Sequence, residues 1–381
     1  MKLVIDASNI RKGGGVTHLQ EVLNAADFTK YGFSKIVLWA PQSTIDRVGV
    51  INGLESKTHP LIEKGGWSAY RFRKFVLDQL IGSDTDLLWA PGGTCISSFR
   101  PYVTMVRNFL PFEKEERDRY KYSKAWWRYM YLEHVQAKSF KQARGLIHIS
   151  HKTDEVINGK INLSGVEQVT IHHGLNERFH LAPRPQRECE EFTEEKPARI
   201  LYVSPINYYK HQDKLIQACA MVRANGLPLQ LDLVGPAFPP AKVAFDRIMA
   251  VCDPGGDWVH WHNEVPYNEV QNYYRNADLY ACMSSCETFG MILLEAMASG
   301  LPVLCSNKSA LPEIQGGTCP EVDPENVSAV ARNLEEIIRS RSLREKCASA
   351  AYERAKSFTW AKCADQTFAF LACCATPRLN K

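Results

Sequence analysis

The chain has 381 residues, which at about 100–200 residues per domain predicts two domains. Apolar residues make up 45% and charged residues 23%, so the chain can bury sizeable cores, and a disordered or fibrous protein is excluded. The net charge of +4 is too small to indicate a nucleic-acid partner, and we expect none.

The cysteines and the hydropathy indicate a cellular location. Twelve cysteines are scattered without a CxxC pair, so we expect reduced thiols. The N-terminal MKLVIDASNI reads as a strand rather than a signal peptide, and no run of about 18 apolar residues predicts a membrane span. We therefore expect a cytoplasmic protein.

In the first half of the chain, short apolar runs alternate with amphipathic stretches. The predicted helices include Val16–Ala26 and Tyr70–Ile81. The predicted strands are Lys2–Ala7, Lys35–Ala40, Leu87–Ala90, Val103–Arg107, Gly145–Ser150 and Gln168–His172. Strands that are apolar on both faces and separated by helices indicate a buried parallel sheet.

The alternation is interrupted once, at residues 179–198, FHLAPRPQRECEEFTEEKPA. Three prolines and a run of charges predict an interdomain linker there. Beyond it the predicted strands are Arg199–Ser204, Leu229–Val234, Trp258–Trp261, Asp278–Met283 and Pro302–Ser306. The predicted helices are Lys210–Ala224, Tyr267–Asn276 and Met291–Ser299. We therefore expect an α/β fold of two doubly wound units facing across a cleft, with domains at 1–178 and 199–360 and a terminal segment at 361–381.

The most informative segment is Cys286–Pro302, CETFGMILLEAMASGLP. Gly290 lies at the expected helix start, where free N–H groups and the helix dipole favour an anion. Glu287 on the preceding loop and Glu295 inside the helix can reach hydroxyls on either side of that anion. A nucleoside diphosphate sugar fits this arrangement. The alternative is that Glu295 is a solvated helix residue and Glu287 a partner of the helix dipole.

The string ETFGMILLEAMASGLPV resembles the E-x7-E segment of retaining GT-B glycosyltransferases of family four, the group 1 glycosyltransferases. ADLYACMSSCETFG, SNKSALPEI at 306–314 and Phe358–Thr359–Trp360 extend the resemblance. It implies the GT-B fold, with two Rossmann-like domains and a C-terminal helix that can cross back to the first domain. It also implies that the first domain binds the acceptor and the second the nucleotide sugar.

The resemblance further implies residue roles. Glu287 would hold the hydroxyls of the donor sugar as a catalytic residue, and Glu295 would bind the ribose hydroxyls. Gly290 and Met291 would offer backbone N–H groups to the sugar or diphosphate. The other donor-binding candidates of this segment are Thr288, which stands where the family often has Gly, and Phe289.

The segment at 201–214, LYVSPINYYKHQDK, places Lys210 at the start of a predicted helix. A lysine there can neutralise a diphosphate leaving group, so Lys210 is a catalytic and donor-binding candidate. The alternative is an ordinary surface lysine. The family usually carries an Arg five positions earlier, where this chain has Pro205, and Arg107 is one candidate substitute.

The first domain offers further donor-site candidates. IDASNIRKGGGVTHL carries Gly13, Gly14 and Gly15, and it resembles the family's N-terminal Gly loop, although a plain tight turn is an alternative. Asn108 stands where many family members have a His or Asp facing the sugar, so the resemblance makes it a catalytic candidate that contacts the sugar. The alternative is a capping or turn residue. His173 is a candidate ligand contact or a structural histidine.

Two motifs that resemble metal sites are not expected to bind metal. The DxD triplet Asp84–Asp86 precedes its strand, away from the expected ligand edge. His260 and His262 have no evident third ligand. We expect no metal and no cofactor.

Residues 113–144 are aromatic and basic, EKEERDRYKYSKAWWRYMYLEHVQAKSFKQAR. Such a helix can lie at an anionic membrane surface, or it can pack on its own sheet with a solvated outer face. The first interpretation predicts peripheral contact with the cytoplasmic face of the inner membrane.

Bacterial members of the family with an IDASNIRKGGG-type start are associated with O-antigen and other surface polysaccharide assembly. The resemblance therefore implies a metal-independent, retaining hexosyltransferase. Its donor would be a nucleotide sugar, with GDP-mannose favoured and a UDP-sugar as the alternative, and its acceptor a polyprenyl-diphosphate-linked glycan. Other interpretations are a sugar-nucleotide epimerase of the same fold and a non-catalytic nucleotide- or glycan-binding protein.

Overall fold

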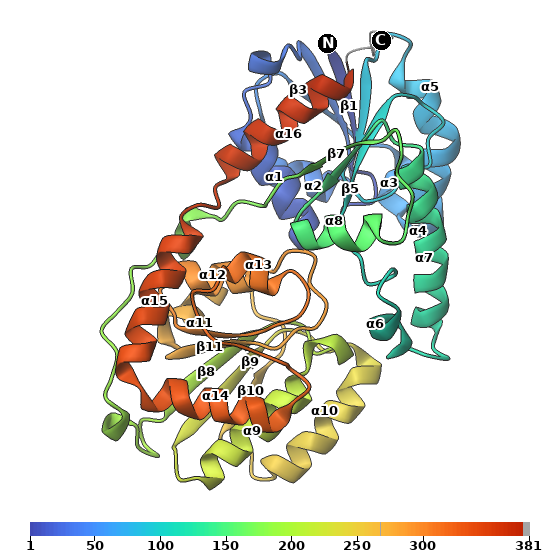
Figure 1. The fold of residues 1–381 in the computed structure, drawn as a ribbon. Helices are drawn as coiled ribbons and strands as arrows, with labels where there is room; N and C mark the ends of the chain where they lie inside the picture. The colour runs from blue at the N-terminus through green and yellow to red at the C-terminus, as the bar shows by residue number, and fades with distance from the viewer. Residues whose placement is uncertain (267, 376–381) are drawn as a thin grey trace. The chain divides into compact units, whose positions relative to one another are not determined.

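The fold is that of a computed structural model, which describes residues 1–266 and 268–375. The chain forms two compact units (Figure 1). Unit 1 comprises Met1–Gly174 with Thr359–Lys381, and unit 2 comprises Leu175–Phe358. Each unit is built on one parallel sheet with helices packed against it, as the alternating pattern of apolar runs predicts.

Unit 1 has a seven-stranded sheet in the order β3-β2-β1-β4-β5-β6-β7. The strands are β1 (Lys2–Asp6), β2 (Lys35–Trp39), β3 (Leu54–Lys57), β4 (Leu87–Ala90), β5 (Tyr102–Val106), β6 (Gly145–His148) and β7 (Glu167–Thr170). Six of these correspond to predicted strands. The edge strand β3, LESK, escapes prediction because it is only partly buried and carries no apolar run.

The helices of unit 1 are α1 (Gly14–Ala25), α2 (Gln42–Val48), α3 (Pro60–Lys64), α4 (Gly66–Arg71), α5 (Leu77–Ile81), α6 (Lys114–Asp118), α7 (Lys124–Lys141), α8 (His151–Asn158) and α16 (Trp360–Ala375). The predicted helix Tyr70–Ile81 is not one regular α-helix. The five residues Phe72–Val76 between α4 and α5 wind as a π-helix, which local sequence periodicity does not reveal.

Unit 2 has a six-stranded sheet in the order β10-β9-β8-β11-β12-β13. The strands are β8 (Ala198–Val203), β9 (Leu229–Val234), β10 (Val259–His262), β11 (Leu279–Cys282), β12 (Val303–Ser306) and β13 (Glu321–Val322). The helices are α9 (Gln212–Ala224), α10 (Pro239–Cys252), α11 (Val270–Asn276), α12 (Met291–Ala298), α13 (Leu311–Gln315), α14 (Val327–Arg339) and α15 (Arg341–Ala355). Tyr267, where the sequence predicts a helix start, lies outside the described residues.

The C-terminal helix α16 belongs to unit 1, in agreement with the expected return of the chain to the first domain. It packs against α1, β4 and β5 (Figure 1). The ring of Phe368 lies 5.2 Å from that of Phe28 and 6.3 Å from that of Trp89. The helix therefore contributes to the core of unit 1 instead of forming an appendage.

Residues 179–198 differ from the expected linker, because the structure places them within unit 2. The Leu181 N–H donates to the Ala298 carbonyl at 2.9 Å, and Arg187 pairs with Asp278 at 2.5 Å. The charges that suggest a solvated linker are thus partly used in ion pairs with the body of unit 2. The crossing between units lies at Gly174–Leu175 rather than at 179–198.

All twelve cysteines are free thiols, as their scattered spacing predicts. Among the described helices, none is both long enough and apolar enough to cross a bilayer.

Gly174 provides a test of how α16 joins unit 1. A Cβ at this position would lie 2.1 Å from the backbone nitrogen of Trp360, a clash that no side-chain rotation relieves. We expect Gly174→Ala to lower the free energy of unfolding by about 3 kcal/mol, seen as a lower urea midpoint. Gly14→Ala is the control, since its Cβ would meet no described atom within 4 Å, and an equal loss in both variants would contradict this packing.

Candidate functional site

In each unit, considered by itself, the strand order of the sheet reverses once. The reversal falls between β1 and β4 in unit 1 and between β8 and β11 in unit 2. In doubly wound sheets, ligands bind outside the carboxyl ends of the strands at such a point. In unit 2, the loop after β8 carries Lys210 and the loop after β11 carries Glu287. The topology therefore brings together two residues that lie 77 positions apart.

Lys210 and Glu287 form an ion pair in unit 2. Lys210 Nζ donates to Glu287 Oε1, and the two side chains are only 7% and 17% exposed. Burial of Lys210 acts to lower its pKa, but the attraction of Glu287 and the hydrogen bond to it outweigh burial, so the pKa lies above its ordinary value. The Lys210 ammonium is therefore fully charged at neutral pH and held at a fixed place.

The position of Lys210 differs from the predicted helix start. It ends a 3-10 turn at Tyr208–Lys210, and α9 begins only at Gln212. His211 between them adopts a left-handed backbone with φ of 51°, which separates the turn from the helix. The alternative of an ordinary surface lysine does not hold, because the turn directs Lys210 into the interior.

Side chains that the sequence analysis did not select hold these two loops in place. The His211 imidazole Nε2 lies 2.9 Å from the Ser285 hydroxyl, and the Ser285 N–H donates to the Tyr209 carbonyl at 2.8 Å. The Ser309 hydroxyl lies 2.6 Å from both the N–H and the carbonyl oxygen of Glu287. Ser309 falls within the SNKSALPEI segment, so the resemblance of that segment was the only signal for it.

Helix α12 begins at Met291, four residues after Glu287. Gly290 precedes its first residue, Met291, with a φ of 102° that favours glycine. A Cβ on Gly290 would also lie 2.7 Å from Leu311 Cδ2. Thr288 is half-buried, whereas Phe289 is buried with its ring 5.9 Å from that of Phe358. A ligand could therefore contact Phe289 through its backbone only.

Glu295 lies in the second turn of α12 and is only 5% exposed, so it is not the solvated helix residue of the alternative interpretation. Its Oε2 accepts a hydrogen bond of 3.1 Å from the hydroxyl of Tyr274 in α11. A carboxylate on a buried helix face is costly unless polar groups satisfy it. Tyr274 is thus a positioning residue for Glu295, and no sequence motif indicates it.

The predicted loop Gly13–Gly15 is only partly a loop, because Gly14 and Gly15 are the first two residues of α1. Gly13 has a φ of 69° and precedes the first residue of α1. Among the described atoms, none lies within 4 Å of where a Cβ of Gly13 or Gly14 would stand. At Gly15, by contrast, a Cβ would lie 3.2 Å from Ile10 and 3.6 Å from the Arg107 guanidinium. The space next to Gly13 and Gly14 is therefore empty of described atoms, whereas the space next to Gly15 is filled by side chains.

The other two unit 1 candidates lie in different surroundings. Asn108 is exposed after β5, and its Oδ1 accepts from the Leu110 N–H at 3.0 Å, the geometry of a turn residue. His173 is 5% exposed, with its ring 4.7 Å from that of His18. Burial, followed by the charge of Arg107, holds the pKa of His173 well below its ordinary value, so its imidazole is neutral.

The motifs that only resemble metal sites have other partners. Asp84 pairs with the Lys2 ammonium at 2.5 Å, and Asp86 accepts from the Lys2 N–H at 2.7 Å. His262 Nε2 lies 2.8 Å from Asp232 Oδ1, and His260 lies 3.8 Å from the same oxygen.

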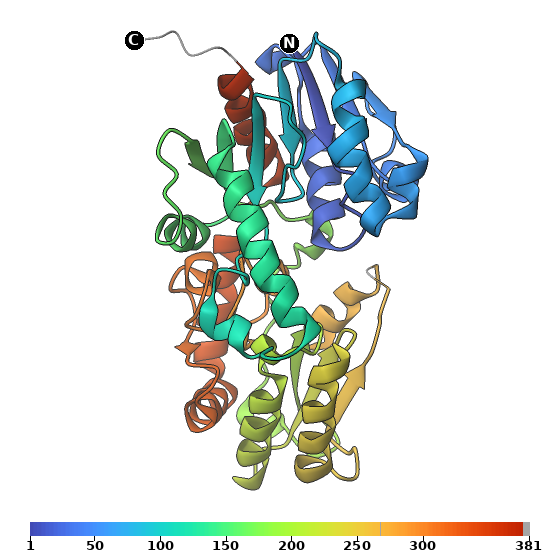
Figure 2. The same ribbon diagram turned by 90° about the vertical axis from the view of Figure 1, so that its right-hand side faces the viewer.

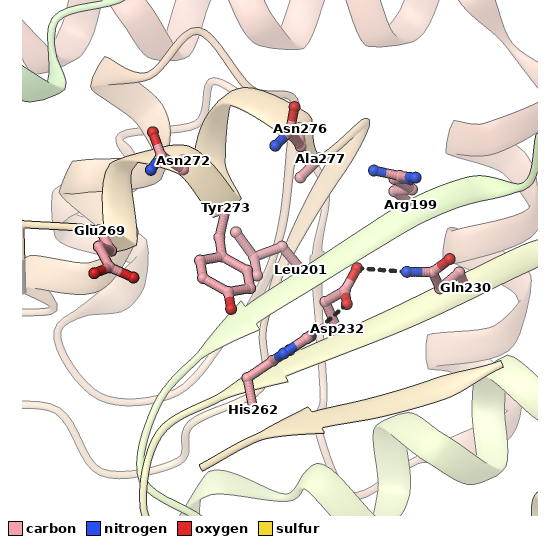
Figure 3. A pocket seen from close by; sticks show the side chains of 10 residues that line it. All are labelled: Arg199, Leu201, Gln230, Asp232, His262, Glu269, Asn272, Tyr273, Asn276 and Ala277. Carbon is pink, nitrogen blue, oxygen red and sulfur yellow. Dashed lines mark hydrogen bonds and ion pairs between the residues drawn. The ribbon is translucent and has the colours of Figure 1, made fainter. Parts of the chain in front are cut away.

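Unit 2 also has a cavity of about 380 Å³ beside α11 (Figure 3). Its lining residues are Arg199, Leu201, Gln230, Asp232, His262, Glu269, Asn272, Tyr273, Asn276 and Ala277. None of the predicted donor-site residues is among them. The cavity is therefore separate from the Lys210–Glu287 pair.

Most of unit 2 is similar to a known family of proteins. Residues 185–354 match the family described as "Glycosyl transferases group 1". An O-antigen chain mannosyltransferase B of Escherichia coli is 34% identical over 110 residues, which cover 29% of this chain and 29% of that protein. A GDP-mannose-dependent alpha-(1-6)-phosphatidylinositol dimannoside mannosyltransferase of Mycobacterium tuberculosis is 28% identical over 217 residues, 55% of this chain and 53% of that protein. The matches thus span about half the length of these relatives or less.

Solved structures match over nearly the whole chain. A sucrose-phosphate synthase of Thermosynechococcus elongatus superposes with a TM-score of 0.76 at 16% identity, covering 96% of this chain and 97% of that one. The Anabaena protein HepE in complex with UDP and glucose superposes with a TM-score of 0.71 at 17% identity, covering 98% and 100%. These likenesses concern the fold, and with the two parallel sheets they confirm the expected GT-B class of two Rossmann-like units.

The ion pair of Lys210 and Glu287 can be tested through stability. Glu287→Gln leaves a buried, unpaired ammonium, and we expect it to lower the free energy of unfolding by about 3 kcal/mol. Adding Lys210→Met removes that charge and should restore part of the loss. Both are measured as urea midpoints.

The exposed pair of Lys242 and Asp246, 2.6 Å apart, is the control for this prediction. Asp246→Asn should cost less than about 1 kcal/mol. If the double variant at 210 and 287 were no more stable than Glu287→Gln, the two charges would not be coupled.

Proposed function

We propose that this chain is a retaining glycosyltransferase that moves a hexose from a nucleotide sugar to a hydroxyl of a lipid-linked glycan in surface polysaccharide biosynthesis. The observation that carries the proposal is the Lys210–Glu287 pair, 7% and 17% exposed, on the loops that follow β8 and β11, with α12 beginning four residues after Glu287. The match of residues 185–354 to group 1 glycosyl transferases supports it independently.

The first step of the proposed mechanism is donor binding in unit 2. The N-terminus of α12, at Gly290 and Met291, offers free N–H groups and a positive dipole to the donor diphosphate. Lys210 adds a fixed positive charge, which stabilises the negative charge that grows on the leaving diphosphate. Because burial and the Glu287 pair hold this ammonium before the donor arrives, little reorganisation accompanies the reaction.

Glu287 holds the donor sugar, and the acceptor hydroxyl attacks from the face that the diphosphate leaves. The departing phosphate takes the proton of that hydroxyl, so the configuration at the anomeric carbon is retained. On this proposal the ion pair loosens when the donor binds. Glu287 then accepts hydrogen bonds from the sugar hydroxyls, and Lys210 donates to the phosphate. Glu295, positioned by Tyr274, binds the ribose hydroxyls.

GDP-mannose is the favoured donor. The Mycobacterium relative is named as GDP-mannose-dependent, and the Escherichia relative as a mannosyltransferase. HepE is seen with UDP and glucose, so a UDP-sugar is the alternative. Since Lys210 and the α12 N-terminus supply positive charge at the diphosphate, we propose that no metal or other cofactor is required. The roles of Gly13, Gly14, Gly15, Asn108 and His173 stay predictions.

The side chains on helix α7, the long green helix in Figure 2, support a lipid-linked acceptor. Trp127 and Tyr131 are 63% and 60% exposed on it, one turn apart, and Met130 is 39% exposed beside them. Lys124, Arg128 and Lys138 are exposed on the same helix. Exposed aromatic rings among basic groups suit an anionic bilayer surface. We propose peripheral contact with the cytoplasmic face of the inner membrane and a polyprenyl-diphosphate-linked acceptor.

Donor binding is tested by thermal shift with GDP, UDP, ADP and their sugar conjugates, with and without EDTA. We expect the largest rise in melting temperature with GDP and GDP-mannose, unchanged by EDTA. Glu295→Ala should weaken nucleotide affinity about tenfold or more, because it removes a charged hydrogen-bond acceptor for the ribose. Tyr274→Phe should weaken it less, since the carboxylate remains.

Glu269→Ala is the matched control, because Glu269 lines the separate cavity of unit 2. It should leave nucleotide affinity unchanged. If Glu269→Ala abolished nucleotide binding and Glu295→Ala did not, the donor site would have to be assigned to that cavity instead. Donor turnover that needs an acceptor would exclude both an epimerase and a non-catalytic binding protein.

Membrane contact is tested by sedimentation with vesicles that contain anionic lipids. Trp127→Ser with Tyr131→Ser should reduce the bound fraction several-fold, because both exposed rings are lost. Trp67→Ser is the control, since Trp67 is 75% exposed on α4 outside the basic helix. If the α7 variant and the wild type bound the vesicles equally, α7 would not be the membrane-contacting helix.

A further inference from the structure

Unit 1 holds a buried cluster of two histidines and a cysteine that the proposed reaction does not use as a group. The cluster consists of His18 in α1, His173 after β7 and Cys363 in α16. One nitrogen of each imidazole and the cysteine Sγ all lie within 4.8 Å of one another. The three side chains are at most 5% exposed. Imidazole and thiolate are the ligands that soft transition-metal ions prefer.

A second observation at the cluster points to a missing ligand. His18 is 2% exposed, and its Nδ1 has no hydrogen-bond partner among the described residues. Buried polar atoms in native structures nearly always have a partner, because leaving one unpaired costs about 1–3 kcal/mol. The His18 ring lies 4.7 Å from the ring of His173 and 6.0 Å from the ring of Trp360, between centroids, so it is surrounded by other buried rings.

Cys363 supplies the thiol of the cluster. It lies in the first turn of α16 and is 1% exposed, so its sulfur is enclosed together with the two imidazoles. A metal ion binds the thiolate form of cysteine and displaces the thiol proton.

Arg107 decides which ion the cluster can accept. This guanidinium is buried beside the cluster, and its charge acts on His18, His173 and Cys363. Burial, with a smaller contribution from Arg107, favours the neutral form of the two imidazoles, which is their metal-binding form, whereas the charge of Arg107 repels a divalent cation. A monovalent ion with one thiolate forms a neutral centre next to Arg107, whereas a divalent ion would leave a second positive charge in a buried place.

We propose that His18, His173 and Cys363 bind one Cu(I) ion. Three ligands and a neutral centre match this soft, low-coordinate ion better than Zn(II), which takes four ligands in structural sites. On binding, the Cu–S bond replaces the Cys363 S–H bond and one proton is released to the solvent. The copper stays Cu(I), so no oxidant or reductant takes part.

The three proposed ligands come from segments that are far apart in the sequence, so a bound ion would link these segments. His173 lies one residue before the end of the first segment of unit 1, and Cys363 lies four residues after the chain returns to it. His18 lies on α1, the helix that begins at Gly14. One bound ion would therefore fasten both crossing segments to that helix, and we expect it to stabilise unit 1.

The test is a titration of the full chain, freed of metal by chelation, with Cu(I) under anaerobic conditions against bathocuproine disulfonate. The wild type should bind one tight Cu(I) that Cys363→Ser binds about tenfold more weakly or worse. Cys374→Ser is the matched control, since it removes another buried cysteine of α16 and should keep the tight site. His18→Gln should weaken the same site. Cu(I) should raise the melting temperature of the wild type and of Cys374→Ser, but not that of Cys363→Ser.

Three outcomes would overturn the proposal. In the first, Cys363→Ser and the wild type bind Cu(I) equally. In the second, Cys374→Ser loses as much affinity as Cys363→Ser, which would assign binding to surplus thiols. In the third, a parallel Zn(II) titration gives the only tight binding that depends on Cys363. Circular dichroism of each variant separates loss of the site from loss of the fold.

Discussion

The buried ion pair of Lys210 and Glu287 is the constraint around which the candidate site of unit 2 is organised. Two charges removed from water are costly, and their mutual attraction compensates only when they are held at contact distance. The left-handed His211, the Ser285 contact and the Ser309 hydrogen bonds supply that fixed geometry. The loops after β8 and β11 thus hold each other, and the start of α12 follows directly from the second loop.

The fold follows from the sequence wherever burial is complete on both faces. The runs at Leu87–Ala90 and Val103–Val106 are wholly apolar or β-branched, and both are central strands. Strands and helices are not predicted correctly where contacts with distant parts of the chain, and not the local sequence, stabilise them. The edge strand Leu54–Lys57 and the two-residue strand Glu321–Val322 gain their structure from one neighbouring strand each. The π-helix at Phe72–Val76 lies inside a segment whose apolar spacing reads as an ordinary helix.

The candidate site was predictable to the extent that it depends on local sequence. The spacing of Glu287, Gly290 and Glu295 identifies the helix start and the two carboxylates that flank it. Burial of Glu295 against Tyr274 was not predictable, because the tyrosine comes from another helix. The same holds for residues 179–198, whose Arg187 finds its partner, Asp278, 91 positions away. Side-chain partners across the fold decide whether a charged residue is solvated or buried, and a linear pattern does not contain them.

The return of α16 to unit 1 has a consequence for how the molecule is made. Residues 175–358 form unit 2 as one continuous stretch, whereas unit 1 is assembled from the two ends of the chain. The residues of unit 2 are contiguous, so this unit can complete its core as soon as they have been translated. The faces of α1, β4 and β5 that α16 covers stay exposed until residues 360–375 follow, so unit 1 closes after unit 2 although its first strand is made earlier.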